Sequence, residues 1–317
     1  MTPPSERAPH GGLGRLVAGA IAFALVAPLA LAALPLAALL LGSSPRTRGE
    51  TVTAGIAAGV SAWWLLGLGE LPDQMVRAAA VLTTAFFVVA TFRTQLSVIH
   101  RGLVAVTGAA AGVVALLAAL GSSWGELQWW VARRASHTAR ILMGQIWFTR
   151  ADPAPEALQQ LEAWLGTVVQ FLSDFFPAVT LLQLLAGLAL ATAVYERVAL
   201  RPVGVPPGRL RDFRFNEHLG WAVVVPLIVV LIPKLGAFKA AAANILLASG
   251  ALYALRGAAV AVFGLQLVGA GGTFLTALLA VIFLLVLPAA LGGAILLGVL
   301  DAGLDLRRRW TPPSVRD

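Results

Sequence analysis

Cysteine is absent from this sequence of 317 residues, and charged residues are scarce. Without cysteine the chain forms no disulfide and has no thiol catalysis, thiolate zinc site or iron–sulfur ligation. Charged residues make up 12% and hydrophobic residues 59% of the chain, whereas a soluble domain carries about 25% charged residues. This composition excludes an ordinary soluble globule, and its apolar content excludes a disordered or fibrous chain. The sequence predicts an integral membrane protein.

Catalytic and metal-binding motifs are missing as well. The four histidines are scattered and form no ligand pair at helical spacing: His10, His100, His137 and His218. There is no phosphate-binding loop that ends in Gly-Lys-Ser/Thr and no Gly-x-Ser-x-Gly nucleophile elbow. Carboxylates lie at the ends of hydrophobic runs and not in pairs inside them. We therefore expect no enzyme activity, no cofactor and no metal site.

Lysine is nearly absent, since only Lys234 and Lys239 stand beside the arginines, although the formal net charge is +8. The basic residues flank hydrophobic runs, an arrangement that sets membrane topology and meets anionic lipid headgroups. They form no long basic run with stacking aromatics, so the expected partner is the lipid bilayer and not nucleic acid. The preference for arginine resembles GC-rich bacterial genomes, and we expect a bacterial cytoplasmic (inner) membrane protein.

The distribution of basic residues also predicts an orientation. If the N-terminus is cytoplasmic, 13 lysines and arginines fall on the cytoplasmic side and 9 on the other side. Cytoplasmic loops of membrane proteins carry the excess of these residues. Both termini are therefore expected in the cytoplasm, although the basic loop Arg197–Arg214 then falls on the opposite side.

Long hydrophobic runs predict an all-α, polytopic membrane bundle of about eight transmembrane helices, because about 20 apolar residues cross the hydrocarbon layer. Pro28 and Pro35 are expected to kink the first run, and Pro177 interrupts the fifth. The runs cover residues 16–41, 52–68, 75–92, 102–120, 167–195, 219–232, 238–268 and 273–300.

Four regions follow from this pattern. Residues 1–120 form an N-terminal membrane bundle of about four spans, and residues 167–310 form a C-terminal bundle of about four more. Between them, residues 121–166 combine arginines with tryptophans, which is typical of a helix in the membrane interface. This connector either lies on the membrane surface or binds a partner protein. Residues 311–317 are a polar tail.

The run over residues 238–268 contains the candidate ligand-binding residues Asn244, Tyr253 and Arg256. Tyr253 and Arg256 share a helix face, and Asn244 lies about 120° away from them. An arginine this deep in a membrane costs several kcal/mol unless it is paired. Two interpretations remain open: a cavity that binds an anionic or carbonyl-bearing ligand, or a structural arginine that holds carbonyls or a carboxylate of another helix.

Small residues recur every seven positions through the same run, at Gly236, Ala243, Gly250, Gly257, Gly264 and Gly271. Such a row lets membrane helices approach closely. It predicts a helix-packing seam at Gly250, Gly257 and Gly264.

Charged clusters precede and follow the C-terminal spans. Arg209, Arg211 and Arg214 precede the sixth run, while Asp301 and Asp305 lie one turn apart at the exit of the eighth. Either cluster could contact lipid headgroups or a partner protein, and Asp305 could pair with Arg309 at helical spacing. A solvated ion-pair cluster is the alternative for the aspartates.

Three stretches of the C-terminal third resemble the YybS-like family of uncharacterised bacterial multi-pass membrane proteins, a domain of unknown function. They are Phe213–Phe215, Asn244 with Tyr253–Gly257, and Gly298–Arg308. That family is similar to the substrate-binding subunits of energy-coupling-factor vitamin transporters and to the rod-shape membrane protein MreD. The resemblance implies a membrane protein, and Arg256 stands where the family often has glutamine.

Two functions are therefore expected. One is a transport-related or small-solute-binding membrane component without its own ATPase, whose small-molecule ligand the sequence does not name. The other is a structural membrane scaffold that docks cytoplasmic or membrane proteins. A water-accessible cavity at Arg256 would favour the first, and a dry, paired Arg256 the second.

Overall fold

The structure, a computed structural model, describes residues 13–149, 155–208, 210–267 and 287–310. Within these ranges the regular structure is helical without any strand, so the predicted all-α class is confirmed. The chain divides after Pro207 into two compact units. Each unit is described by itself.

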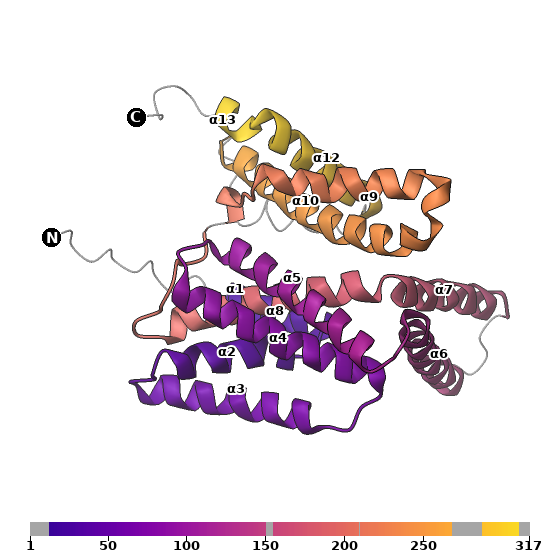
Figure 1. Ribbon diagram of the computed structural model, residues 1–317, viewed down its shortest axis with the longest axis horizontal. Coiled ribbons are helices and arrows are strands. Elements are labelled where there is room, and N and C mark those ends of the chain that lie inside the picture. Colours follow the sequence, from indigo (N-terminus) through magenta and orange to yellow (C-terminus); the bar gives the residue numbers. More distant parts are fainter. Residues whose placement is uncertain (1–12, 150–154, 209, 268–286, 311–317) are drawn as a thin grey trace. The chain divides into compact units, whose positions relative to one another are not determined.

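The first unit is built from eight helices among its described residues (Figure 1). The helix α2 contacts α3, α4 and α8, and α4 packs along α5. The helices are α1 (Leu13–Val26), α2 (Ala30–Gly42), α3 (Arg48–Leu66), α4 (Leu71–Arg93), α5 (Val98–Ala119), α6 (Trp124–Thr149), α7 (Pro155–Asp174) and α8 (Phe176–Val198).

The first expected span is not one kinked helix, because the chain breaks into α1 and α2 around Pro28. Proline lacks the N–H that would continue the helical ladder. The side-chain amide of Gln183 in α8 donates to the Val26 carbonyl at 2.6 Å, which satisfies a group at the break. Pro35, in contrast, stays inside α2. The fifth expected span is also divided, since α7 ends at Asp174 and α8 begins at Phe176, with Pro177 in its first turn.

Local sequence signals explain where several helices begin. Thr47 and Glu50 form a reciprocal capping box at the start of α3. Ser97 caps α5 by accepting from the His100 N–H. Pro72 occupies the first turn of α4, where its missing N–H has no helical partner to lose.

Apolar packing joins α2, α4, α5 and α8 in the core of the first unit. Leu39, Leu40, Phe87 and Tyr195 are buried there. The closest backbone approach is at Gly187, where an added Cβ would lie 2.8 Å from the Leu31 carbonyl oxygen. Glycine therefore permits the contact between α8 and α2.

The helices α6 and α7 form a hairpin from the expected connector. The Arg133 guanidinium lies over the rings of Trp129 and Trp130, at 5.2 and 5.3 Å from their centroids. On α7, Trp164 is exposed. This mixture suits a lipid interface, and the location of residues 121–166 on the membrane surface stays a prediction.

The second unit contains a long helix, α10, with α9 and α12 packed against it. Figure 1 draws α10 in orange beside the yellow α12. Of the eighth expected span, residues 273–286 lie outside the described residues. The bounds are η1 (Leu210–Asp212), η2 (Glu217–Gly220), α9 (Trp221–Leu231), η3 (Pro233–Phe238), α10 (Lys239–Leu267), α12 (Leu287–Leu304) and α13 (Leu306–Trp310).

Among the described helices, α4, α5, α8 and α10 are long and apolar enough to cross a membrane. Shorter apolar helices occur in α1, α2, α9 and α12. The helix α3, which corresponds to the second expected span, is not among them. It carries Arg48 and Glu50 in its first turn, and glycine, threonine and serine interrupt its aliphatic residues. The structure is that of a multi-pass helical membrane protein.

Candidate functional site

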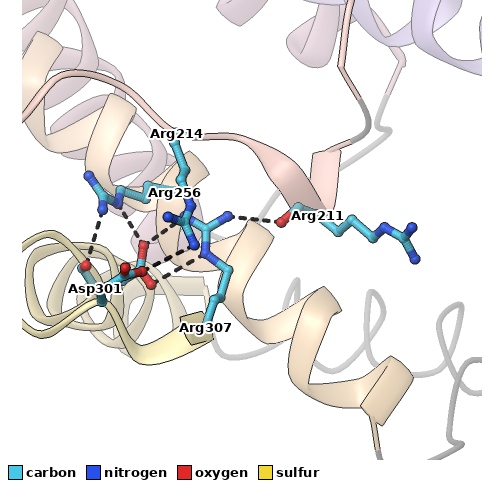
Figure 2. A network of polar contacts seen from close by, with 6 residues as sticks. Arg211, Arg214, Arg256, Asp301 and Arg307 are labelled. Carbon is cyan, nitrogen blue, oxygen red and sulfur yellow. Dashed lines mark hydrogen bonds and ion pairs between the residues drawn. The ribbon is translucent and has the colours of Figure 1, made fainter. Parts of the chain in front are cut away.

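A buried cluster of charged side chains occupies the polar end of the second unit (Figure 2). The Arg256 Nε donates to Asp301 Oδ2 at 2.8 Å, and its Nη2 donates to the Asp301 carbonyl at 3.1 Å. From the other side, Arg307 donates through Nη2 to Asp301 Oδ2 at 2.7 Å and through Nε to Oδ1 at 3.3 Å. Asp301 is 0% exposed, so one fully buried carboxylate holds two arginines.

Close helix packing brings Arg256 and Asp301 together. A Cβ added at Gly257 would collide with the Ala294 carbonyl oxygen, and one added at Gly298 would collide with the Tyr253 carbonyl oxygen. Because both positions are glycine, the backbones of α10 and α12 approach closely. Arg256, next to Gly257, therefore reaches the end of α12.

The end of α12 turns the chain so that Arg307 points back to the same carboxylate. Asp305 adopts the left-handed conformation, with φ 47°, between α12 and α13. Aspartate tolerates this conformation better than most residues. The Arg307 Nη1 also donates to the Arg211 carbonyl at 2.8 Å, which joins η1 to the cluster (Figure 2).

Aromatic rings cover the buried arginine. The Arg256 guanidinium carbon lies 5.1 Å from the Phe215 ring centroid, a cation–π distance. Phe215 in turn makes an edge-to-face contact with Tyr253, with centroids 5.0 Å apart. Arg256 is 5% exposed, and within the described residues its Nη1 has no hydrogen-bond partner. The contact with the Phe215 ring compensates part of the free-energy cost of burying this unpaired N–H group.

A cavity of about 490 Å³ opens next to this cluster. Its lining carries four arginines against two aspartates and is therefore net positive. Arg214 forms an ion pair with Asp305 at 3.1 Å on its edge. The lining residues are Arg211, Asp212, Arg214, Phe263, Asp305, Arg307 and Arg308. A small anion is the kind of solute that such a surface attracts.

The candidate ligand-binding residues lie apart from this cavity. Tyr253 and Arg256 come together in the buried cluster, and neither lines the cavity. Asn244 lies further back along α10, where its side-chain amide donates to the Ala240 carbonyl at 2.9 Å. Arg256 is thus held by a carboxylate of another helix, which is one of the two arrangements that the sequence left open.

The glycine row meets different surroundings along α10. Gly257 faces backbone, whereas a Cβ at Gly250 or Gly264 would make ordinary contacts, 4.0 Å from Ile295 and 3.7 Å from Trp310. A crossing pair of helices is closest near one point. The row therefore provides one tight contact among the described residues and two loose ones.

The residues that the sequence suggested for lipid or partner contact fall into two groups, one at the cavity and one in the interior. Arg214 is exposed and Arg211 is half-buried at the cavity, and Arg209 lies outside the described residues. Asp301 is in the interior instead, because Arg256 and Arg307 surround its carboxylate. Asp305 pairs with Arg214 rather than with Arg309, since the left-handed turn at Asp305 ends the helical spacing.

The sequence assigned no site role to Arg307, Phe215 or Gly298, although all three lie in the stretches that resemble the YybS-like family. Arg307 is one of three consecutive arginines after a span, which is typical of solvated flanking residues, and only its contact with Asp301 distinguishes it. Gly298 is separated from Gly257 by 41 positions. A search for small residues at the start of the charged C-terminal motif would have found it.

The first unit also contains a buried arginine, Arg101, which has the sequence position of a flanking charge. Arg101 is 1% exposed and donates to the Val205 carbonyl at 2.7 Å. Its guanidinium lies against Gly204, whose φ of +96° favours glycine. Nearby, Glu50 accepts from the Leu200 N–H at 2.6 Å and Tyr195 from the Val203 N–H at 3.0 Å. Side chains of α3, α5 and α8 thus fix the segment that follows α8.

Comparisons with known proteins identify a family to which this chain is similar. Searches of curated proteins and of solved structures give no match. Residues 16–302 match the family described as Predicted membrane protein (DUF2232). The match spans both units and reaches Asp301. The chain therefore belongs to this family of membrane proteins.

Proposed function

We propose that the protein is a transport-related membrane component that binds a small anionic solute in the cavity of the second unit. The observation that supports this proposal is the net positive lining, with four arginines around about 490 Å³. Since the sequence has no ATP-binding motif, energy would come from a partner protein or an ion gradient. The YybS-like family, which the C-terminal third resembles, is similar to energy-coupling-factor substrate-binding subunits, and this similarity agrees with the proposed role.

The buried ion pair between Asp301 and Arg307 holds one cavity arginine in place before an anion binds. Asp301 fixes Arg307 through two hydrogen bonds, so this side chain loses little conformational freedom when a solute arrives. Arg211 and Arg308 add charge from η1 and α13. Arginine presents several N–H donors in a planar fork, which matches phosphate and carboxylate oxygens.

Binding of inorganic phosphate, sulfate and succinate to the purified protein in an uncharged detergent tests the proposal. We expect saturable binding of at least one of these anions. Arg308→Gln should weaken that binding about tenfold, because it removes a charged donor. Arg309→Gln is the matched control, since Arg309 neighbours Arg308 and does not line the cavity. Proteoliposome uptake under a proton or sodium gradient then tests transport.

The absence of saturable binding for all three anions would contradict the proposal. So would equal affinities of the parent and Arg308→Gln proteins. Uptake that does not respond to either gradient would remove the transport role and leave a binding protein.

A structural scaffold is the second candidate, and the buried ion pair between Arg256 and Asp301 favours it. In this case the exposed Arg214 and the half-buried Arg211 would face an acidic partner. MreD, to which the YybS-like resemblance extends, agrees with such a role. Affinity purification in mild detergent should then recover a defined partner with the parent but not with the double variant Arg211→Gln/Arg214→Gln.

For either function we propose a location in a bacterial cytoplasmic membrane with both termini in the cytoplasm. The excess of basic residues on the side of the termini supports this orientation.

A further inference from the structure

An apolar groove lies between α1 and α8 of the first unit, with a volume of about 630 Å³. The two helices contact each other. One charged side chain, Arg197, is part of the lining, and all other lining residues are apolar or glycine. They are Leu16, Gly19, Ala22, Phe23 and Val26 from α1, and Ala186, Ala189, Leu190 and Ala193 from α8.

Small side chains hollow out this groove. Gly19 and Ala22 face it from α1, and Ala186, Ala189 and Ala193 face it from α8. Because these side chains are short, the groove between the two helices has room for an apolar chain. Larger residues, such as Phe23 and Leu190, contribute apolar surface to its sides.

The groove has the length of one membrane leaflet. From Ala186 to Arg197 the helix α8 rises about 16 Å, at about 1.5 Å per residue. Half of the hydrocarbon layer is about 15 Å thick. Arg197 lies in the last turn of α8, at one end of this length, and its side chain is exposed. An arginine at the end of a membrane helix is placed at the headgroup level.

The opposite end of the groove is lined by apolar residues, and a carbonyl at the end of α1 has a hydrogen-bond donor there. The Gln183 side chain donates to the Val26 carbonyl at 2.6 Å, where α1 ends. No other charged side chain lines the groove among the described residues. Positive charge at one end and hydrocarbon surface along the rest correspond to an anionic headgroup followed by an acyl chain.

We propose that this groove binds one anionic phospholipid, with an acyl chain against α1 and α8 and the phosphate on Arg197. A transmembrane helix of a second copy or of another protein fits less well, because it would need apolar surface over about 30 Å. It would also have to supply an anion to Arg197.

Binding of dioleoyl phosphatidylglycerol and dioleoyl phosphatidylcholine to the purified full chain, measured by native mass spectrometry, tests the proposal. We expect the parent to bind phosphatidylglycerol about tenfold more tightly than phosphatidylcholine. Arg197→Gln should abolish this preference, and Ala189→Phe, which fills the groove, should weaken both lipids about tenfold.

Two matched controls accompany these variants. Arg93 is an exposed arginine at the end of α4, and Ala111 is an exposed alanine of α5. Arg93→Gln and Ala111→Phe should leave the affinities within about twofold of the parent.

Three results would overturn the proposal. The parent could bind both lipids equally, or Ala189→Phe could bind phosphatidylglycerol as tightly as the parent does. A change of oligomeric state in Ala189→Phe, with unchanged lipid affinity, would identify the groove as an interface between copies. Unlike the anion cavity, this site is tested with lipids alone, so each proposal can fail independently.

Discussion

At the scale of single residues, Asp301 determines how both arginines of the cluster can be tolerated. An unpaired charge in a membrane interior costs several kcal/mol. Asp301 accepts from Arg256 and Arg307 and carries no exposed surface. One buried carboxylate therefore stabilises two buried cations. Removing Asp301 would leave both cations unpaired, whereas removing one arginine leaves Asp301 paired with the other.

Replacing Arg256 by methionine should destabilise the protein by about 1.5–3 kcal/mol, because the change removes two hydrogen bonds to Asp301. The loss stays moderate because Arg307 keeps the carboxylate paired. Denaturant or thermal unfolding of the purified variant beside the parent measures the loss. Arg309→Met is the control, since Arg309 is exposed, and its expected effect is within about 0.5 kcal/mol. A variant as stable as the parent would contradict a structural role of Arg256.

The stability of the protein should depend on pH through Glu50. Its carboxylate accepts from the backbone N–H groups of Leu200, Arg46 and Thr47, and these bonds lower the pKa of Glu50 to about 2. The stabilisation is fully present above the unfolded-state pKa of about 4.3 and is lost as the pH falls toward the folded-state pKa. The free energy of unfolding should therefore decrease between about pH 4.5 and pH 2.

The variant Glu50→Gln checks this assignment. Its amide has one acceptor oxygen in place of two, so the variant should be less stable than the parent at pH 7. The difference between the two proteins should shrink as the pH is lowered below about 4.5. A difference that stays constant from pH 7 to pH 3 would contradict the prediction.

At the scale of helices, the seven-residue row shows which packing information a sequence carries. Periodicity alone finds the face of α10 that offers small residues. The place of the tight contact depends on where α12 crosses, and this is a property of two helices. Gly257 and Gly298 lie at that crossing, whereas Gly250 and Gly264 lie beside it.

Alanine substitutions along the row should therefore change the stability of the protein in different directions. Gly257→Ala should destabilise by about 1–3 kcal/mol or more, because its Cβ would enter the Ala294 backbone. Gly250→Ala and Gly264→Ala meet ordinary contacts and should be neutral or more stable by up to about 1 kcal/mol, since alanine favours the helix. Unfolding of the three purified variants decides the matter. Equal effects at all three positions would refute a single point of contact.

Prolines also show that a local sequence pattern does not determine how a helix is packed. Pro28, Pro35 and Pro177 all fall in apolar runs, yet only Pro35 lies within the body of a helix. Membrane helices tolerate proline when neighbouring groups satisfy the freed carbonyls. At Pro28 the chain breaks, and Gln183 of another helix supplies a donor to Val26. Such a donor 157 positions away cannot be deduced from the local pattern.

At the scale of the whole molecule, composition was sufficient to predict an all-α membrane protein, because scarce charge and long apolar runs are properties of the full chain. The buried arginines were only half predictable. A cost for Arg256 follows from its position in an apolar run, but its partner lies 45 positions away. Arg101 looked like a flanking charge, and only its bond to Val205, 104 positions away, reveals its burial. Pairing across such distances depends on helix packing.

The absence of cysteine makes the predicted topology directly testable, since every introduced thiol is the only one in the chain. We expect single cysteines at Ser5 and Ser314 to resist a membrane-impermeant maleimide in spheroplasts and to react after permeabilisation. Gln95→Cys, in the exposed loop between α4 and α5, should react without permeabilisation. The physical reason is the excess of lysine and arginine on the side of the termini, which retains that side in the cytoplasm. Labelling of just one terminus in spheroplasts would imply an odd number of crossings, and labelling of both would invert the orientation.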